Sequence, residues 1–516
     1  MKMLRWALLI LPIAVAGFVV TGRPRTPVHV GSKTFTESVV LGEVLTQLVK
    51  HAGVEVAHVA QLGGTSILFE ALLNGEIDMY VEYTGTIQEE ILAGRRLSDS
   101  ASIEAALAES GVRMSAPLGF NNTYAIGMLR PVAERFGLTR VSDLRAQPSL
   151  RLAFSNEFID RVDGWPGLRD HYALPQTDVR GVDHDLAYPA LESRAIDVTD
   201  LYTTDAKILK FDLVVLDDDR NHFPRYDAVI LYRSDLDRRL PAVAKAILAI
   251  EGGISEEEMI GMNAGVELDG ITEPIAAANF LASRLGIKTV RRSSSVGANI
   301  LKHTREHLRL VLLSLAAAVM VAIPLGIWAF TRPAAGHVIL GIVGIVQTIP
   351  SLALLVMLMK PLSALGSAFP WLSSVGVSGI GEAPAIVALF FYSLLPIVRN
   401  TCVGLQDVDP EIRESADAMG LPFRARLRLI DLPLAARAII AGIKTAAVMN
   451  IGFATLGAII GAGGYGQPIL TGIRLNDFAL ILQGAGPAAG LAILAQLWFE
   501  LVERAVVPRG LRLAPS

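Results

Sequence analysis

The sequence predicts two unlike domains, a soluble α/β domain followed by an all-helical membrane domain. The chain has 516 residues, which is more than one hydrophobic core usually supports. Charge divides it, because 39 acidic and 31 basic residues occur up to His303, but only 11 and 15 occur after it. Long apolar runs dominate the second part. We therefore expect a mildly acidic globular domain before this point and a membrane domain after it.

Residues 1–27 are typical of an export signal. Lys2 and Arg5 precede an uninterrupted apolar run over residues 6–20. A cleaved signal peptide and an uncleaved membrane anchor both fit this pattern, and both place the next domain outside the cytoplasm. The chain has a single cysteine, Cys402, which excludes an intramolecular disulfide.

Residues 28–286 alternate short β-rich runs with helical patterns. We expect strands at 28–30, 54–59 and 79–81, and helices at 37–51, from a cap at 63–66 to 73, and at 86–92. This order is typical of an α/β domain with a largely parallel sheet. Such domains bind ligands beyond the carboxyl ends of their strands, where helix starts offer free N–H groups to anions. Thr65, Ser66 and Thr86 lie at such helix starts.

Four tyrosines lie in polar, loop-like contexts rather than in core patterns. They are Tyr83, Tyr124, Tyr202 and Tyr226. Aromatic faces attract cations that cannot donate hydrogen bonds, so these side chains are candidates for a cage around a quaternary ammonium group. The alternative is that they are ordinary half-buried tyrosines with satisfied hydroxyls.

Four segments resemble the substrate-binding domains for glycine betaine, proline betaine, choline and related osmoprotectants. They read GSKTFTE at 31–37, GGTS at 63–66, YVEYTGT at 80–86 and DGWPGL at 163–168. The resemblance covers residues 28–285. It implies a two-lobed α/β domain of the periplasmic-binding-protein type (type II), which closes over its ligand.

The resemblance also implies a set of ligand-binding residues. A zwitterion is favoured over choline, because choline leaves Lys33 and Arg161 unpaired in a closed cleft. The alternative for Lys33 is a solvated surface position. The implied residues are Tyr83, Tyr124, Tyr202 and Tyr226 for the cation, and Lys33, Thr86 and Arg161 for the carboxylate, with Thr65 at its helix start as a further binding residue.

Residues 287–307 are expected to form a linker, and residues 308–516 a polytopic all-α domain. Apolar spans lie at 310–330, 338–359, 383–398, 438–461 and 478–502. Most of them approach the ~20 residues that cross a bilayer. Arginines cluster after the third and fifth spans, which places those segments and the C-terminus in the cytoplasm. Lys302, Arg305 and Arg309 disagree with this topology, and we expect them in an interfacial helix.

The loop after the third span carries the most specific motif. It reads ESADAMG at 414–420, then nine residues, then IDLP at 430–433. This resembles the EAA loop of type I importer permeases, E-x-A-x3-G-x9-I-x-L-P, with Ser415 in place of the first alanine. In that family the loop forms a short coupling helix that docks on an ATPase subunit. The residues implied for coupling are Glu414, Ala416, Gly420, Ile430, Leu432 and Pro433.

Three further short motifs occur in the second half of the chain. The QTIPS segment at 347–351 also looks like these permeases, and it places a helix-breaking proline within a span, which is tolerable where the helix faces protein or a pathway. GAGGYG at 461–466 matches G-x-G-x-x-G but follows a membrane span, so we interpret it as a loop. HTREH at 303–307 matches a metalloprotease pattern without an evident third ligand.

These features predict the fused substrate-binding and membrane subunit of an ABC importer in the inner cell membrane, taking up glycine betaine or a related quaternary-ammonium osmoprotectant. No G-x-x-x-x-G-K-[ST] occurs, so we expect a separate ATPase subunit to bind ATP. We expect no cofactor, metal or nucleic acid, contact with membrane lipid, and a homodimer, because each copy supplies one coupling loop. The alternatives are a choline, carnitine, thiol-betaine or amino-acid substrate, or a ligand-sensing receptor. An enzyme is disfavoured, because we find no nucleophile, base and metal set.

Overall fold

The computed structural model describes residues 28–95, 100–162, 164–288, 295–369, 371–372 and 376–507. The predicted export segment at 1–27 and residues 289–294 of the predicted linker lie outside the described residues. The chain forms two compact units, composed chiefly of Thr26–Ser293 and of Ser294–Thr471 with Ala479–Ser516. They are called the soluble unit and the membrane unit below.

The first lobe of the soluble unit is built on a five-stranded sheet in the order β2-β1-β3-β10-β4. Its strands are β1 Val28–Gly31, β2 Val56–Val59, β3 Met79–Tyr83, β4 Val112–Met114 and β10 Ala228–Arg233. Its helices are α2 Thr36–His51, α3 Thr65–Leu73, α4 Thr84–Thr86, the π-helical turn η1 Ile87–Ile91, α5 Ser100–Glu109, α10 Leu236–Arg239, α11 Pro241–Leu248, α12 Glu256–Glu267 and α13 Glu273–Leu285. All five residues of β3 are buried, so this central strand lacks the alternation of a half-exposed strand.

The second lobe is inserted between β4 and β10. It holds a three-stranded sheet in the order β8-β5-β9 and the pair β6-β7. Its strands are β5 Tyr124–Leu129, β6 Leu152–Ser155, β7 Val179–Val182, β8 Thr199–Tyr202 and β9 Leu213–Leu216. Its helices are α6 Arg130–Phe136, the 3-10 helix η2 Val141–Ala146, α7 Trp165–Tyr172, α8 His184–Glu192 and α9 Lys207–Lys210.

The sheets are less parallel than the sequence pattern predicts. β1 runs parallel to β2 and β3, and β6 runs parallel to β7. However, β10 is antiparallel to β3 and β4, and β5 is antiparallel to β8 and β9. β5 and β10 are the strands that the chain enters directly after crossing from one lobe to the other. They therefore join their sheets without the helical crossover that a parallel pair requires.

Local chemistry sets several helix ends in the soluble unit. Asp183 precedes α8 and accepts a hydrogen bond from the N–H of Asp185 at 3.1 Å. Ser255 and Glu258 form a reciprocal capping box at the start of α12. Gly137 ends α6 with a φ of 63°, a left-handed conformation that glycine adopts without strain.

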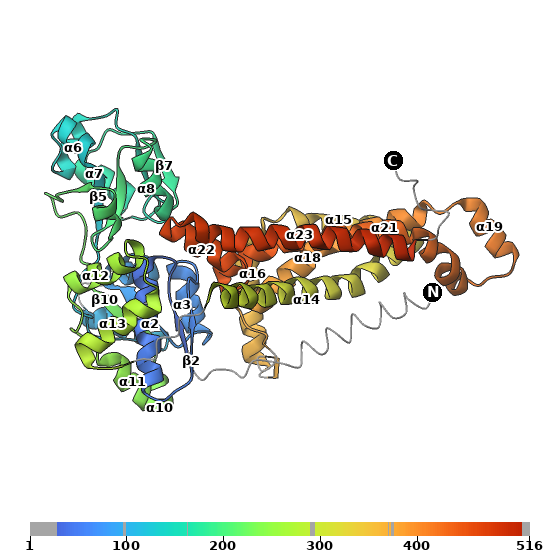
Figure 1. The fold of residues 1–516 in the computed structure, drawn as a ribbon, viewed down its shortest axis with the longest axis horizontal. Coiled ribbons are helices and arrows are strands. Elements are labelled where there is room, and N and C mark those ends of the chain that lie inside the picture. The colour runs from blue at the N-terminus through green and yellow to red at the C-terminus, as the bar shows by residue number, and fades with distance from the viewer. Residues whose placement is uncertain are drawn as a thin grey trace. The chain divides into compact units, whose positions relative to one another are not determined.

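The membrane unit is entirely helical over its described residues. Its helices are α14 Val296–Thr331, α15 Pro333–Thr348, α16 Ser351–Ala368, α18 Glu382–Gln406, α19 Pro410–Ala418, α20 Phe423–Arg426, the π-helical turn η3 Leu427–Asp431, α21 Leu432–Phe453, the 3-10 helix η4 Ala454–Ile460, α22 Gly466–Leu475 and α23 Phe478–Val506. Within this unit α18 packs along both α14 and α21, and α19 lies beyond the end of these long helices (Figure 1). Five described segments are long and apolar enough to cross a membrane.

Two sequence-based boundaries differ in the membrane unit. The predicted span at 338–359 is divided between α15 and α16, with the break at Ile349 and Pro350. Proline lacks the N–H that would continue α15 and holds the preceding residue extended, and Ile349 accordingly has φ −66° and ψ 127°. The second half of the predicted linker, from Val296, is already part of α14. Lys302, Arg305 and Arg309 are therefore helical, and Arg309 pairs with Glu382 at 3.1 Å.

Candidate functional site

The four predicted tyrosines come together where the two lobes of the soluble unit meet. Tyr83 ends β3 and Tyr226 precedes β10 in the first lobe. Tyr124 begins β5 and is paired with Tyr202 of β8 in the second lobe. The ring centroid of Tyr124 lies 5.2 Å from that of Tyr202 and 5.6 Å from that of Tyr226. Tyr83, Tyr124 and Tyr226 are 4%, 5% and 2% exposed, so these rings face one another rather than solvent.

Two phenylalanines extend this group. The ring of Phe35 lies 6.2 Å from that of Tyr83 and 5.5 Å from that of Tyr202, and so links the two lobes. Phe158 lies 5.0 Å from Tyr124. The aromatic cluster of the soluble unit thus consists of Phe35, Tyr83, Tyr124, Phe158, Tyr202 and Tyr226.

Gly85 and Thr86 continue the segment that Tyr83 begins. A Cβ atom at Gly85 would lie 2.6 Å from Cε1 of Tyr226, closer than real side chains approach. A larger residue at Gly85 would therefore displace Tyr226 from the cluster. Thr86 is 6% exposed and belongs to α4, directly beyond the end of β3. The YTGT segment thus contains Tyr83 itself, and its Gly85 leaves the space that the ring of Tyr226 occupies.

Lys33 is buried and already has an acidic partner. Its Nζ lies 2.5 Å from Oε1 of Glu82 and donates to Oγ1 of Thr65 at 2.9 Å. Lys33 is 6% exposed, so the interpretation of a solvated surface residue is wrong. Glu82 is 0% exposed, and burial raises the pKa of its carboxyl, an effect that the charge of Lys33 opposes. The ammonium also lies 5.8 Å from the ring centroid of Tyr83.

Arg161 reaches the aromatic cluster from the second lobe. It donates to the hydroxyl of Tyr226 at 2.9 Å and lies 3.5 Å from a carboxylate oxygen of Glu90. Its guanidinium carbon is 5.4 Å from the ring centroid of Tyr124 and 5.8 Å from that of Tyr226. The predicted carboxylate-binding residues therefore lie beside the cluster, and each of the two cations has an acidic neighbour of its own.

Glu37 is a central polar residue that the sequence-based prediction omitted. Its carboxylate accepts hydrogen bonds from the hydroxyl of Tyr83 at 2.6 Å and from Nδ2 of Asn122 at 2.9 Å. It also accepts from the hydroxyl of Thr204 at 2.5 Å and from Nδ2 of Asn263 at 3.1 Å. Burial raises the pKa of Glu37, although these donors oppose the shift. Because Thr204 belongs to the second lobe, Glu37 holds the lobes together and fixes the hydroxyl of Tyr83.

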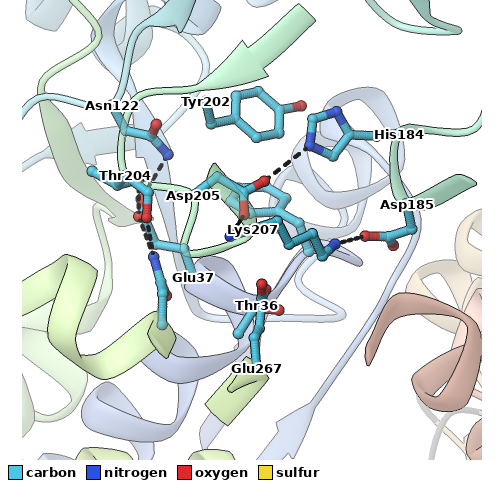
Figure 2. Close-up of a pocket in the computed structure, with 12 residues that line it drawn as sticks. Thr36, Glu37, Asn122, His184, Asp185, Tyr202, Thr204, Asp205, Lys207 and Glu267 are labelled. Atoms are coloured by element: carbon cyan, nitrogen blue, oxygen red, sulfur yellow. Dashed lines mark hydrogen bonds and ion pairs between the residues drawn. The ribbon is translucent and has the colours of Figure 1, made fainter. Parts of the chain in front are cut away.

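A cavity of about 20 Å³ adjoins the aromatic cluster and is bordered by Phe35 and Tyr202. Figure 2 shows Asn122, Thr204 and Glu37 along one side of it, with His184 and Asp185 on the other. The imidazole of His184 lies 4.4 Å from the ring of Tyr202, against the outside of the cluster.

The far side of this cavity is a network of charged groups. Lys207 lies 2.5 Å from Asp185. Burial would raise the pKa of Asp205, but the hydrogen bond with His184 and the charge of Lys207 lower it to about 2. Burial, together with the charge of Asp205, raises the pKa of Glu267 to about 7. The cavity therefore holds a carboxyl group that titrates near neutrality beside one that stays ionised.

Sequence reasoning missed Phe35, Glu37 and Glu82, although all three lie in the segments that carried the resemblance. Phe35 and Glu37 belong to GSKTFTE, and Glu82 directly precedes Tyr83. Only the tyrosines of these segments were considered as aromatic contacts. A consideration of every aromatic and carboxylate in the same segments would have found them.

The predicted coupling loop forms α19, α20 and η3 in the membrane unit. Asp409 caps α19 by accepting from the N–H of Glu411 at 2.9 Å. Glu414 is exposed on α19, whereas Ala416 is 0% exposed. Gly420 follows the helix with a φ of 75°, a conformation that favours glycine. Ile430, Leu432 and Pro433 are half-buried where η3 passes into α21.

A buried carboxylate holds the helical segments of the coupling loop together. Asp431 is 0% exposed and lies 3.2 Å from Nε of Arg413 and 3.5 Å from Nε of Arg426. Arg426 also pairs with Asp417 of α19 at 2.6 Å. These ion pairs join α19 to the start of α21, so a force on the short helix passes directly to a long one.

No group of three or more His, Cys, Asp or Glu within the described part of the chain is placed to hold a metal ion. A two-lobed solute-binding domain fused to a multi-pass helical membrane unit with a coupling loop defines the binding and membrane component of an importer.

Comparison with known proteins identifies its family. Residues 26–283 match the substrate-binding domain of ABC-type glycine betaine transport systems, and residues 318–508 match the inner membrane component of binding-protein-dependent transport systems. The chain belongs to the ABC importers of the glycine betaine, choline and carnitine osmoprotectant family, with its substrate-binding domain fused in front of the permease domain. The sequence-based predictions of family, fold class and transport function are confirmed.

Individual relatives match each part of the chain. The glycine betaine/carnitine/choline transport system permease protein OpuCB of Bacillus subtilis is 40% identical over 217 residues, which are 42% of this chain and 92% of the relative. The ergothioneine transport permease/ergothioneine binding protein EgtU of Helicobacter pylori is 32% identical over 268 residues, 51% of this chain and 48% of that one. The crystal structure of a glycine betaine/carnitine/choline ABC transporter covers 50% of this chain and 98% of its own, at 28% identity and a TM-score of 0.43.

Proposed function

We propose that this protein takes up a small quaternary-ammonium osmolyte, glycine betaine or a close relative, with energy from a separate ATPase subunit. The observation that carries the proposal is the buried aromatic cluster between the two lobes. A trimethylammonium group has no N–H to donate, so aromatic faces hold it at ~0.5–2 kcal/mol each. Ordinary cations lose more hydration than such faces return, which makes the cluster selective for soft cations.

The other end of a betaine would face the polar residues beside the cluster. Arg161 binds a carboxylate through its planar fork, and Lys33, Thr65 and Thr86 supply further donors. For Lys33 this requires the ammonium to share its donors between the ligand and Glu82, which lies 2.5 Å away.

Choline is the second candidate, and a specific observation favours it. The preference for a zwitterion assumed that choline would leave Lys33 and Arg161 unpaired. In this structure Glu82 lies beside Lys33 and Glu90 beside Arg161, so a ligand without a carboxylate leaves neither cation without a counter-charge. The relative OpuCB is named for choline as well as for glycine betaine and carnitine, and EgtU is named for ergothioneine.

The partner ATPase is proposed to dock on the coupling loop. Apolar side chains project from it into solvent, since Ile412 and Met419 are 42% and 71% exposed. Such side chains outside the membrane spans are typical of a protein interface. Two copies of the chain would present two such loops to two ATPases, with the soluble unit outside the cell and the coupling loop and C-terminus in the cytoplasm.

Calorimetric titration of the purified full-length chain tests the substrate class. Glycine betaine, choline, carnitine, ergothioneine and proline form the panel. We expect binding of at least one compound with a trimethylammonium group and none of proline, whose secondary ammonium donates hydrogen bonds that aromatic faces cannot accept well. Binding of proline alone would contradict the proposal. Uptake by vesicles that also contain the ATPase then tests transport.

A further inference from the structure

A cavity lies inside the membrane unit, far along the chain from the soluble site. It has a volume of about 10 Å³ and is bounded by α16, α18, α21 and η4. The rings of Tyr392 and Phe453 form one wall, with centroids 5.2 Å apart and planes inclined by 47°. Small residues, including Ala385, Ala388 and Gly457, form much of the rest. None of its lining side chains carries a charge.

The cavity adjoins the break between α15 and α16. Its lining includes Ser351, the first residue of α16, and the hydroxyl of Tyr392 donates to the carbonyl of Ile349 within the break. Non-helical backbone at membrane depth is tolerated where it is buried in protein or lines a pathway.

A polar group lies one helical turn from Phe453. Asn450 is 0% exposed, and its Nδ2 donates to the hydroxyls of Ser314 at 3.0 Å and Ser393 at 2.8 Å. Its Oδ1 is buried and has no hydrogen-bond partner among the described residues. Polar side chains within membrane helices form hydrogen bonds across helices in this way, and Asn450 of α21 thus joins α14 and α18 beside the cavity. Ser393 follows Tyr392 directly, so the polar group and the aromatic pair occupy the same depth of α18.

We propose that this cavity is a transit site for the quaternary-ammonium group of the substrate within the membrane unit. The inference rests on the function proposed above. Tyr392 and Phe453 offer their faces to the cation, and no lining side chain carries a charge that would repel it. The site is weaker than the aromatic cluster of the soluble unit, because it has two rings instead of six. A permeating solute requires such a site to bind well enough to admit it and weakly enough to release it.

The cavity is closed in this conformation. A volume of about 10 Å³ is roughly that needed by one water molecule, so a trimethylammonium group enters only when α16 and α18 separate. The break at Ile349 and Pro350 uncouples α16 from α15 and gives α16 freedom to move. The small residues on α18 leave room once it has moved.

Uptake of radiolabelled substrate by proteoliposomes holding the full chain and its ATPase tests the site. We expect Tyr392→Leu and Phe453→Leu each to lower the maximal uptake rate at least 10-fold while the half-saturating concentration stays within 2-fold. Tyr392→Phe and Phe453→Tyr, which keep the rings, should retain uptake within 3-fold. Phe390→Leu, on the same helix but outside the cavity, is the matched control.

Two results would overturn the transit site. One is undiminished uptake by the leucine variants, and the other is an equal loss in the ring-retaining variants or in the Phe390→Leu control, which would show a packing role alone. A wild-type protein that transports no trimethylammonium compound would instead contradict the proposed function, and the transit site would fall with it.

A thiol-labelling measurement tests ligand preference directly. Because Cys402 is the single cysteine, Cys402→Ala gives a cysteine-free background for Ala388→Cys in the cavity wall. During ATP turnover the rate of trimethylammonium-ethyl methanethiosulfonate divided by that of its sulfonate counterpart should exceed the same ratio for a free thiol in solution at least 10-fold, and millimolar substrate should lower it. Adding Tyr392→Leu should return the ratio to that of the free thiol. A ratio equal to that of the free thiol without this substitution, or no reaction with either reagent, would contradict the proposal.

Discussion

The soluble site and the coupling loop use their motif residues in opposite ways. In the soluble unit the motif residue Tyr83 is 4% exposed and lies within the aromatic cluster, where a ligand would bind. In the coupling loop the motif residue Ala416 is 0% exposed, and Asp431 inside the motif is an internal anchor. The most exposed apolar side chain there is Met419, which the motif leaves unspecified. Buried motif residues thus lie where a ligand would bind in one region, and support an exposed surface from within in the other.

The largest predicted effect is a loss of uptake on substitution of Met419, the exposed apolar residue of the coupling loop. Met419→Glu places a charge on the face proposed to enter the ATPase, at a cost of ~3 kcal/mol in an apolar groove, or about 100-fold in assembly. Uptake should fall accordingly, while substrate binding and thermal stability stay unchanged because the side chain is 71% exposed. Met419→Leu, which keeps an apolar surface, is the control. Normal uptake by the glutamate variant would show that the exposed face is not the interface.

In the aromatic cluster, the ring should matter more than the hydroxyl. Tyr83→Ala removes one aromatic face and should weaken substrate binding by ~2 kcal/mol, about 30-fold. Tyr83→Phe keeps that face and loses only the hydrogen bond to Glu37, so it should bind within a few-fold of wild type. Calorimetry on the full-length chain measures both. Equal losses in the two variants would assign the role to the Glu37 network instead of to the ring.

The charge partners should decide between betaine and choline. Glu82→Gln frees Lys33 for a ligand carboxylate, a charge-assisted hydrogen bond of ~1.5 kcal/mol, so the affinity for glycine betaine relative to choline should rise about 10-fold. Glu90→Gln is the matched variant at Arg161. Its effect should be smaller, since the Glu90 side chain is 31% exposed while that of Glu82 is 0% exposed. An unchanged ratio in Glu82→Gln would mean that Lys33 does not meet the ligand.

The sequence predicts the order of elements well because that order depends on local patterns. Alternating β-rich and helical runs predict β1 through α3 closely, and apolar length predicts five spans. The directions of β5 and β10 follow instead from the two crossings between lobes, which no local pattern reports. Likewise, an apolar run at 338–359 does not show that Pro350 divides it into two helices.

The site is predictable in its residue types but not in its pairings. Motif spacing indicates the tyrosines, Lys33 and Arg161, and the structure brings them together. Lys33 and Glu82 are 49 residues apart in the chain, and Glu82 lies in a strand that is buried on both faces, so alternation gives no sign of its neighbour. The preference for a zwitterion assumed that Lys33 has no acidic partner, and the sequence gives no sign of its ion pair with Glu82.

The last prediction concerns stability alone, in the charged cavity beside the aromatic cluster. Burial and the charge of Asp205 raise the pKa of Glu267 to about 7 from an ordinary value of 4.5. Unfolding lets this carboxyl ionise freely above pH 4.5, so its contribution to stability falls as the pH rises from there to about 7 and stays low above it. The shift corresponds to about 3 kcal/mol, and a domain of this size changes its melting temperature by ~2–4 °C per kcal/mol. Glu267→Gln should therefore melt several degrees above wild type at pH 8 and equal it near pH 4.5.

His184, Asp185, Asp205 and Lys207 also line the cavity but are common to both proteins, so the difference between the two melting curves isolates Glu267. A difference that is constant across this pH range would show that Glu267 acts through packing rather than through its charge, and that the charged cavity, unlike the ion pair of Lys33 and Glu82, has no electrostatic part in the soluble unit's stability.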